Sequence, residues 1–169
     1  MRVTTRTMTQ SRRPRWAARL VGLGLTTALA VTFTAGPAAA VPGDPSASGE
    51  QPVEVPGNPT FATLPASITS FTCDRIVTVD PVTAGSFGDD DEVSILNIGT
   101  DNTFDFTISD DFAAIGVLVK GGPVANLYDY RPVGIQADQE LHAPVNPMNM
   151  TYYGLSNLDF CLVEDNYNS

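Results

Sequence analysis

The chain contains one histidine, His142, and this residue limits the catalytic chemistry that the sequence can support. Ser156, Asp138 and Asp159 are the residues that could complete a hydrolase triad with it. Serine hydrolases usually carry the nucleophile on a Gly-x-Ser-x-Gly elbow, and the segment GLSNL around Ser156 lacks the second glycine. A zinc site would need further histidine or cysteine ligands. The preferred interpretation of His142 is a hydrogen-bonding loop residue, and a hydrolase that uses it is the alternative.

Two acidic runs could supply oxygen ligands to a metal ion. They are Asp89, Asp90 and Asp91 in GDDDE, and Asp110 and Asp111 in SDD. Ca²⁺ prefers about six to eight hard oxygen ligands, but the spacing of an EF-hand loop is absent. A solvated acidic surface is the default interpretation, and a Ca²⁺ site assembled from these loops is the alternative.

A lysine and several tyrosines form a second group of candidates. Lys120 precedes a Gly-Gly-Pro corner and is interpreted first as a charge partner of a carboxylate and second as a ligand clamp. Tyr128 and Tyr130 have the same parity and should share one face of a strand, while Tyr152 and Tyr153 precede the last predicted strand. Exposed tyrosines are platforms for sugar rings or partner side chains, and ordinary packing is the alternative. The candidate binding residues are Tyr128, Tyr130, Lys120 and His142.

These residues lie in a chain whose hydrophobic periodicity is almost entirely that of β-strands. Short runs rich in Val, Ile, Thr, Phe and Tyr alternate with turn compositions rich in Gly, Pro, Asn and Asp. The predicted strands cover residues 70–80, 91–100, 103–110, 115–122, 125–130 and 155–164. Their number and spacing predict an all-β fold, an antiparallel β-sandwich in one domain.

The first 65 residues differ in composition from the rest. Residues 1–40 hold six of the nine basic residues, followed by an apolar stretch and an Ala-x-Ala site, which is the order of a signal peptide. Cleavage is predicted after Ala40, with an uncleaved membrane anchor as the alternative. Residues 41–65 are rich in proline and predict a disordered linker. Residues 66–169 are the predicted β-sandwich domain.

Charge and cysteine content indicate the compartment and the partners. Without the signal peptide, three basic and nineteen acidic residues remain, a net charge of −16. Such a surface repels nucleic acid and anionic membranes, so the expected partners are cations, neutral saccharides or basic proteins. Cys73 and Cys161 are expected to form a single disulfide, which would close a loop of 88 residues and stabilise the fold by about 4–5 kcal/mol. A reactive thiol or a metal ligand is the alternative.

Three motifs in the second half of the chain resemble an uncharacterised domain of bacterial secreted and surface proteins. They are VKGGPVANLYDY, DQELHAPVNP and YYGLSNLDFC, and the resemblance covers roughly residues 115–161. The family pattern is VKGGxxAxxYxY, D-x-x-LHxPxN and YGLSHxxFC, so Asn157 stands where the pattern has His. The resemblance implies an extracellular role, beside adhesion-like repeats or a surface anchor, and supplies no catalytic residue.

The sequence therefore predicts a secreted, extracellular, non-catalytic module that binds a carbohydrate or a surface protein. Two alternatives remain open: a small secreted hydrolase that uses His142, and a purely structural domain with a Ca²⁺ site. No other cofactor is indicated, and neither nucleic acid nor a membrane is an expected partner after signal cleavage.

Overall fold

The computed structural model describes residues 43–165, and the predicted signal peptide, residues 1–40, lies outside them. Eleven β-strands and one 3₁₀ helix fall within this range. The predicted all-β class is therefore confirmed. No helix in the described part of the chain is long and apolar enough to span a bilayer.

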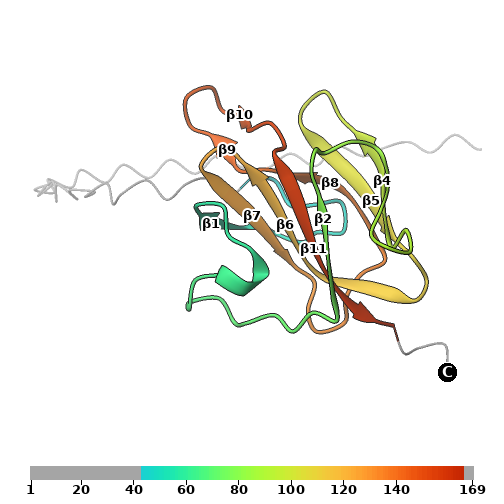
Figure 1. Ribbon diagram of the computed structural model, residues 1–169. Helices are drawn as coiled ribbons and strands as arrows, with labels where there is room; N and C mark the ends of the chain where they lie inside the picture. Colours follow the sequence, from blue (N-terminus) through green and yellow to red (C-terminus); the bar gives the residue numbers. More distant parts are fainter. Residues whose placement is uncertain (1–42, 166–169) are drawn as a thin grey trace, which may run out of the picture. The chain divides into compact units, whose positions relative to one another are not determined.

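Two antiparallel sheets face each other and form a sandwich (Figure 1). The larger sheet has the strand order β1–β7–β6–β11–β2, and the smaller has the order β3–β4–β5–β8. The larger sheet comprises β1 Val53–Pro56, β7 Val124–Asp129, β6 Phe112–Gly121, β11 Asn157–Glu164 and β2 Arg75–Val79. The smaller comprises β3 Gly85–Phe87, β4 Val93–Ile98, β5 Thr103–Ile108 and β8 Ala137–His142. A separate hairpin pairs β9 Val145–Asn146 with β10 Thr151–Tyr152.

The main core fills the space between the two sheets. Strand β5 shows the alternation that the sequence predicted, because Phe104, Phe106 and Ile108 are buried and the residues between them are only partly buried. The Phe106 ring meets the Phe160 ring of β11 edge-on at a centroid distance of 5.2 Å. Aromatic pairs in this arrangement add to the stabilisation that burial alone gives. The six predicted strands all overlap observed ones, whereas β1, β3 and β8–β10 were not predicted.

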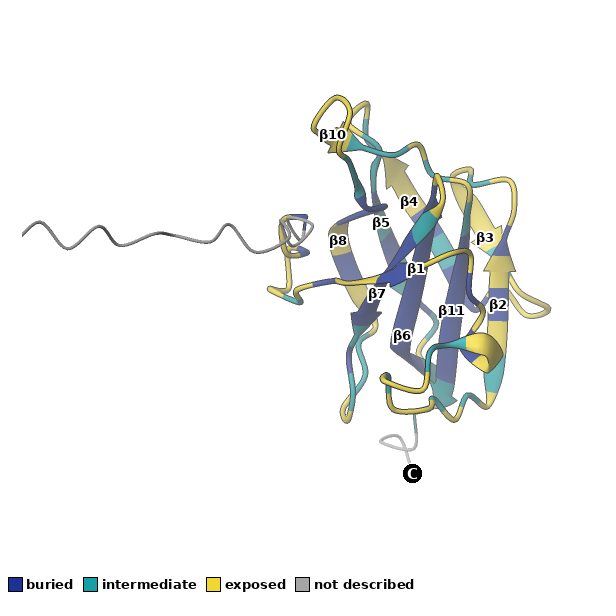
Figure 2. Ribbon diagram, turned by 90° about the vertical axis from the view of Figure 1, so that its left-hand side faces the viewer, coloured by how far each residue is buried: buried dark blue, intermediate teal, exposed yellow. Residues whose placement is uncertain are grey.

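The outer face of the larger sheet carries a second buried cluster. Figure 2 shows the central strands β6 and β11 coloured as buried over most of their length. The members of the cluster from the sheet are Val55, Ile115, Leu118, Ala125, Leu127 and Cys161. Phe61, in the 3₁₀ helix η1 Phe61–Thr63, packs against them, as do Leu64, Ile68 and Phe71. We call residues 57–74 the covering segment. It explains why β6 is buried at nine consecutive positions, 113–121, instead of at alternate ones.

The linker prediction for residues 41–65 is wrong for residues 43–65, which belong to the fold. Strand β1 pairs with β7 at the edge of the larger sheet, with Val53 opposite Leu127 and Pro56 opposite Val124. The prolines do not prevent this, because an edge strand needs hydrogen bonds on one side only. The folded unit therefore includes residues before position 66.

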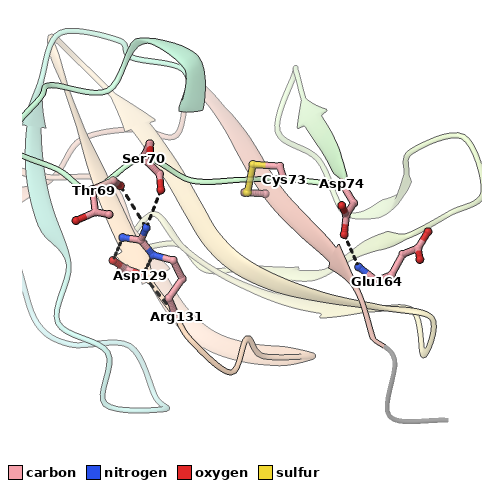
Figure 3. Close-up of a disulfide and its surroundings, with 8 residues drawn as sticks. Thr69, Ser70, Cys73, Asp74, Asp129, Arg131 and Glu164 are labelled. Carbon is pink, nitrogen blue, oxygen red and sulfur yellow. Dashed lines mark hydrogen bonds and ion pairs between the residues drawn. A yellow bond between two sulfur atoms is a disulfide. The ribbon is translucent and has the colours of Figure 1, made fainter. Parts of the chain in front are cut away.

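The predicted disulfide is confirmed and fastens the covering segment to β11. Cys73 and Cys161 have their Cα atoms 5.2 Å apart (Figure 3). Next to the disulfide, the Asp74 amide donates to the Leu162 carbonyl (2.9 Å), and the Asp74 carboxylate accepts from the Glu164 amide (3.0 Å). The end of the segment is thus held both covalently and by hydrogen bonds.

Arg131 is the second anchor of the covering segment. It forms a fork with the Asp129 carboxylate, with its Nε and Nη2 atoms 2.8 and 2.5 Å from the oxygens. Its Nη1 donates to the carbonyls of Thr69 (3.2 Å) and Ser70 (3.1 Å) (Figure 3). Its guanidinium also lies 3.7 Å from the centroid of the Phe71 ring. The hydrogen bonds from Arg131 hold the pKa of Asp129 below its usual value.

Candidate functional site

The two tyrosines predicted as a binding platform face the interior. Tyr128 and Tyr130 share a face, as their parity predicted, but they are only 0% and 9% exposed. The Tyr128 hydroxyl donates to the His142 carbonyl and accepts from the His142 amide, and the Tyr130 hydroxyl donates to Asp138 (2.7 Å). Burial raises the pKa of both hydroxyls. The prediction of an exposed platform is therefore wrong for this pair, because the face that they share points at the smaller sheet.

His142 is buried at the end of β8 and bonds to backbone. Its Nδ1 lies 2.8 Å from the Ala143 carbonyl oxygen, and its Nε2 lies 2.7 Å from that of Asp44. Nδ1 is also 3.4 Å from the Asn126 amide nitrogen. The Tyr152 ring stacks on the imidazole with centroids 3.7 Å apart. These contacts agree with the interpretation of His142 as a hydrogen-bonding residue.

The residues of the hydrolase alternative do not converge. Ser156 is exposed and is not a hydrogen-bond partner of the His142 ring. Asp159 pairs with Lys120, and Asp138 binds donors from other segments. A nucleophile must lie within hydrogen-bond reach of its base. The geometry therefore gives no support to a triad built on His142.

A strap of residues 43–52 crosses β8 and covers these buried polar groups. The Ala47 amide donates to the Gln139 carbonyl (2.9 Å), and Ser48 donates to Asp138 through both its amide (2.9 Å) and its hydroxyl (2.8 Å). Burial alone would raise the pKa of Asp138, but hydrogen bonds from Ser46, Tyr130 and Ser48 hold it below its usual value. The strap is thus tied to the sandwich through an ionised carboxylate.

A pocket of about 540 Å³ lies where the strap meets the β4–β5 loop and the β9–β10 hairpin. Figure 1 shows the loop and the hairpin at the same end of the sandwich. The lining residues are Gly43, Asp44, Thr100, Asp101, Asn102, Val145, Met150, Thr151 and Tyr152. Two hydrogen bonds join the walls: the Asn102 amide donates to the Tyr152 carbonyl (3.2 Å), and the Tyr152 hydroxyl donates to the Asp44 carboxylate (3.1 Å).

The electrostatics of the pocket favour a ligand that donates hydrogen bonds. A hydrogen bond from the Thr103 hydroxyl (2.8 Å) lowers the pKa of Asp101, which is therefore ionised at neutral pH. Partial burial and the bond to Asp44 raise the pKa of Tyr152, so its hydroxyl stays neutral. None of the lining residues is basic. The pocket can accept hydrogen bonds from hydroxyl or ammonium groups and has no cation to hold an anion.

The predicted calcium ligands are not brought together. Asp89, Asp90, Asp91, Asp110 and Asp111 are all exposed. Within residues 43–165, no three side chains of His, Cys, Asp or Glu gather in a way that could hold a metal ion. The observed exposure matches the default interpretation of a solvated acidic surface.

Lys120 is confirmed as a charge partner. It is 5% exposed, and its Nζ lies 2.7 Å from Oδ2 of Asp159, which is 4% exposed. The Thr78 hydroxyl donates to the other oxygen of Asp159 (2.8 Å). Lys120 does not line the pocket, so it is not a clamp for a ligand bound there.

The sequence does not indicate most of the residues that line the pocket as candidate site residues. The sequence places Asp101 and Asn102 only between the predicted strands 91–100 and 103–110, and Tyr152 only as one of two tyrosines before the last predicted strand. Asp44 lay in the predicted linker. Turn composition marks such residues as loop residues, but only the tertiary fold brings the strap against the hairpin.

No family model, curated protein or solved structure matches the chain. The resemblance of the three motifs to a bacterial surface-protein domain therefore stays a prediction.

Proposed function

We propose that the protein is a secreted, extracellular, non-catalytic module that binds a neutral carbohydrate in the pocket beside the strap. The lining of the pocket carries this proposal. The carboxylates of Asp44 and Asp101 and the amide of Asn102 lie beside the Tyr152 ring and the Met150 side chain. Sugars present hydroxyl groups that donate to such acceptors, together with apolar C–H faces that pack on aromatic and aliphatic groups.

Charge supports a neutral sugar over an acidic one. The predicted mature chain has three basic and nineteen acidic residues, and two carboxylates lie in the pocket itself. An anionic ligand would be repelled both by the overall field and at the site. The signal-like sequence of residues 1–40 and the disulfide both support secretion, because disulfides persist in oxidising compartments.

The test is a screen of the mature protein against neutral glycans, followed by titration calorimetry on those that bind. In Asp101→Asn, the affinity should fall roughly tenfold or more, because a hydrogen bond to a charged acceptor contributes about 1.5–3 kcal/mol. The matched control is Asp110→Asn, which makes the same change at an exposed residue outside the pocket. Absence of any glycan binding, or equal affinity in the two variants, would contradict the proposal.

A surface protein is the second candidate, favoured by the tip of the β9–β10 hairpin. Met148 and Met150 are 93% and 68% exposed. Exposed methionines adapt to apolar partner surfaces, and an apolar group at an exposed tip is a common feature of protein contacts. Binding of labelled protein to intact bacterial cells distinguishes the two candidates. A protein partner predicts a loss of binding after the cells are treated with protease and in Met148→Gln, but unchanged binding in Asp101→Asn.

A further inference from the structure

Three polar side chains meet on the outer face of the larger sheet, away from the pocket. Lys120 near the end of β6 lies directly opposite Asn157 of β11, and Asp159 follows two residues later on the same face of β11. Side chains at opposed positions of neighbouring strands have Cβ atoms about 4.5–5.5 Å apart. The Lys120 Nζ also lies 2.7 Å from the Asp159 carboxylate. An amine, a carboxamide and a carboxylate are therefore held in one cluster.

Burial makes this cluster unusual. Lys120 and Asp159 are 5% and 4% exposed, and the strand neighbours of Lys120 on its other side include Ala125 of β7. The side-chain oxygen Oδ1 of Asn157 is buried and has no hydrogen-bond partner in the described part of the chain. An unpaired buried acceptor is unfavourable and uncommon in a native structure. It needs an explanation that the binding proposal does not supply.

We propose that Lys120 and Asn157 become joined by an intramolecular amide bond, with Asp159 as the catalytic group that moves the protons. The Asp159 carboxylate takes a proton from the Lys120 ammonium, and the neutral Nζ attacks Cγ of Asn157. The Nζ–Cγ bond forms and the Cγ–Nδ2 bond breaks. One Lys120 proton stays on the new amide, and the other two leave with the Asn157 amide group as an ammonium ion. Charge is conserved, and nothing is oxidised or reduced.

The surroundings favour this reaction in two ways. The strand register holds the amine beside the carboxamide, which replaces a bimolecular encounter with an intramolecular one. Exclusion of water disfavours the separated charges of the Lys120–Asp159 pair and makes proton transfer within the pair less costly. Released ammonium diffuses away, so the crosslink accumulates.

We assign Asn157, not Asp159, as the residue that the Lys120 amine attacks. The reason is that the Asp159 carboxylate already accepts two hydrogen bonds. Both oxygens of Asp159 accept hydrogen bonds, Oδ2 from Lys120 and Oδ1 from Thr78 (2.8 Å). This arrangement holds Asp159 as a proton acceptor, whereas Oδ1 of Asn157 has no such bond. Condensation of Lys120 with Asp159 itself would release water in place of ammonia. The intact mass of the protein therefore distinguishes a bond to Asn157 from a bond to Asp159.

The first test is the intact mass of the purified protein after reduction of the disulfide, calculated from its observed N-terminus. The expected mass is lower than that of the sequence by one ammonia. Trypsin gives a second readout, because only Arg75 and Lys120 are cleavable basic residues after position 42, Arg131 being followed by proline. Denatured, crosslinked protein should remain uncut after Lys120, so the segments on either side of this residue should stay in one fragment.

Variants identify the participating groups. The full mass, corrected for the substitution, should be restored in each of Lys120→Arg, Asn157→Ala and Asp159→Asn. The control is Asn97→Ala, which changes an exposed asparagine of β4 and should still show the loss of one ammonia. A wild-type mass equal to that of the sequence would overturn the proposal, and this result does not depend on whether any variant folds. A loss of one water, with fragmentation placing the link at Asp159, would overturn the assignment of acceptor and catalytic group.

Discussion

At the scale of single residues, Asp138 joins the strap to the sandwich. Its carboxylate accepts hydrogen bonds from the Ser48 amide and hydroxyl, the Tyr130 hydroxyl and the Gln139 amide. Because these bonds lower its pKa in the folded state, Asp138 stabilises the fold at pH values above the ordinary aspartate pKa of about 3.9. This contribution is lost as the pH falls from that value through the lower, folded pKa.

We expect Asp138→Asn to lower the free energy of unfolding at pH 7 by roughly 1–3 kcal/mol, because it replaces a charged acceptor of several bonds. The difference from the wild type should shrink below about pH 4, where the wild-type carboxylate is also being protonated. Urea unfolding at both pH values measures this effect, with Asp110→Asn as an exposed control. A difference that stays constant with pH would show that the Asp138 charge does not contribute.

Arg131 is a second residue whose side chain binds several partners at once. Lysine keeps the charge but cannot form the fork with Asp129 or stack on Phe71 in the same way. We expect Arg131→Lys to cost roughly 1–2 kcal/mol in the free energy of unfolding. In an Asp129→Ala background, Arg131→Ala should still destabilise, because its bonds to the Thr69 and Ser70 carbonyls remain. If Arg131→Ala causes no further loss of stability in the Asp129→Ala background, Arg131 stabilises the fold only through its ion pair with Asp129.

At the scale of elements, the alternation of apolar and polar residues located the strands. It could not tell which face of a strand points to the core and which to the solvent. The parity of Tyr128 and Tyr130 predicted a shared face correctly, yet only the position of the second sheet decides that this face is internal. Strand β6 is buried on both faces because the covering segment packs on its outer side. Local composition could not reveal the strap or β1, since prolines suit both a linker and an edge strand.

The strap supplies a prediction that local composition would not suggest. A Cβ atom at Gly43 would clash with Cε1 of the buried His142 ring, whereas one at Gly154 would meet no atom within 4 Å. We expect Gly43→Ala to destabilise the attachment of the strap by roughly 1–3 kcal/mol and Gly154→Ala to have little effect. Hydrogen exchange of the Ala47 and Ser48 amides measures this attachment. Equal protection in the two variants would show that the strap is held without this close contact.

At the scale of the whole molecule, two layers pack on the larger sheet and are held by different means. The smaller sheet is joined through the main core, whose apolar side chains come from both sheets. The covering segment, by contrast, depends on a short apolar cluster, the Arg131 anchor and the disulfide. The proposed Lys120–Asn157 bond would link β6 to β11 inside one sheet, so it could not replace the disulfide in holding this layer.

We therefore expect Cys73→Ala/Cys161→Ala to lose about 4–5 kcal/mol, because the disulfide closes a loop of 88 residues in the unfolded chain. Guanidinium unfolding of this variant should resemble that of the reduced wild type. Limited proteolysis should cut first within residues 57–74, because the covering segment loses its covalent tie to β11. If stability falls by the expected amount while this segment stays protected, the disulfide acts mainly on the unfolded chain. If stability hardly changes, Arg131 and the apolar cluster suffice to hold the layer, and the prediction is wrong.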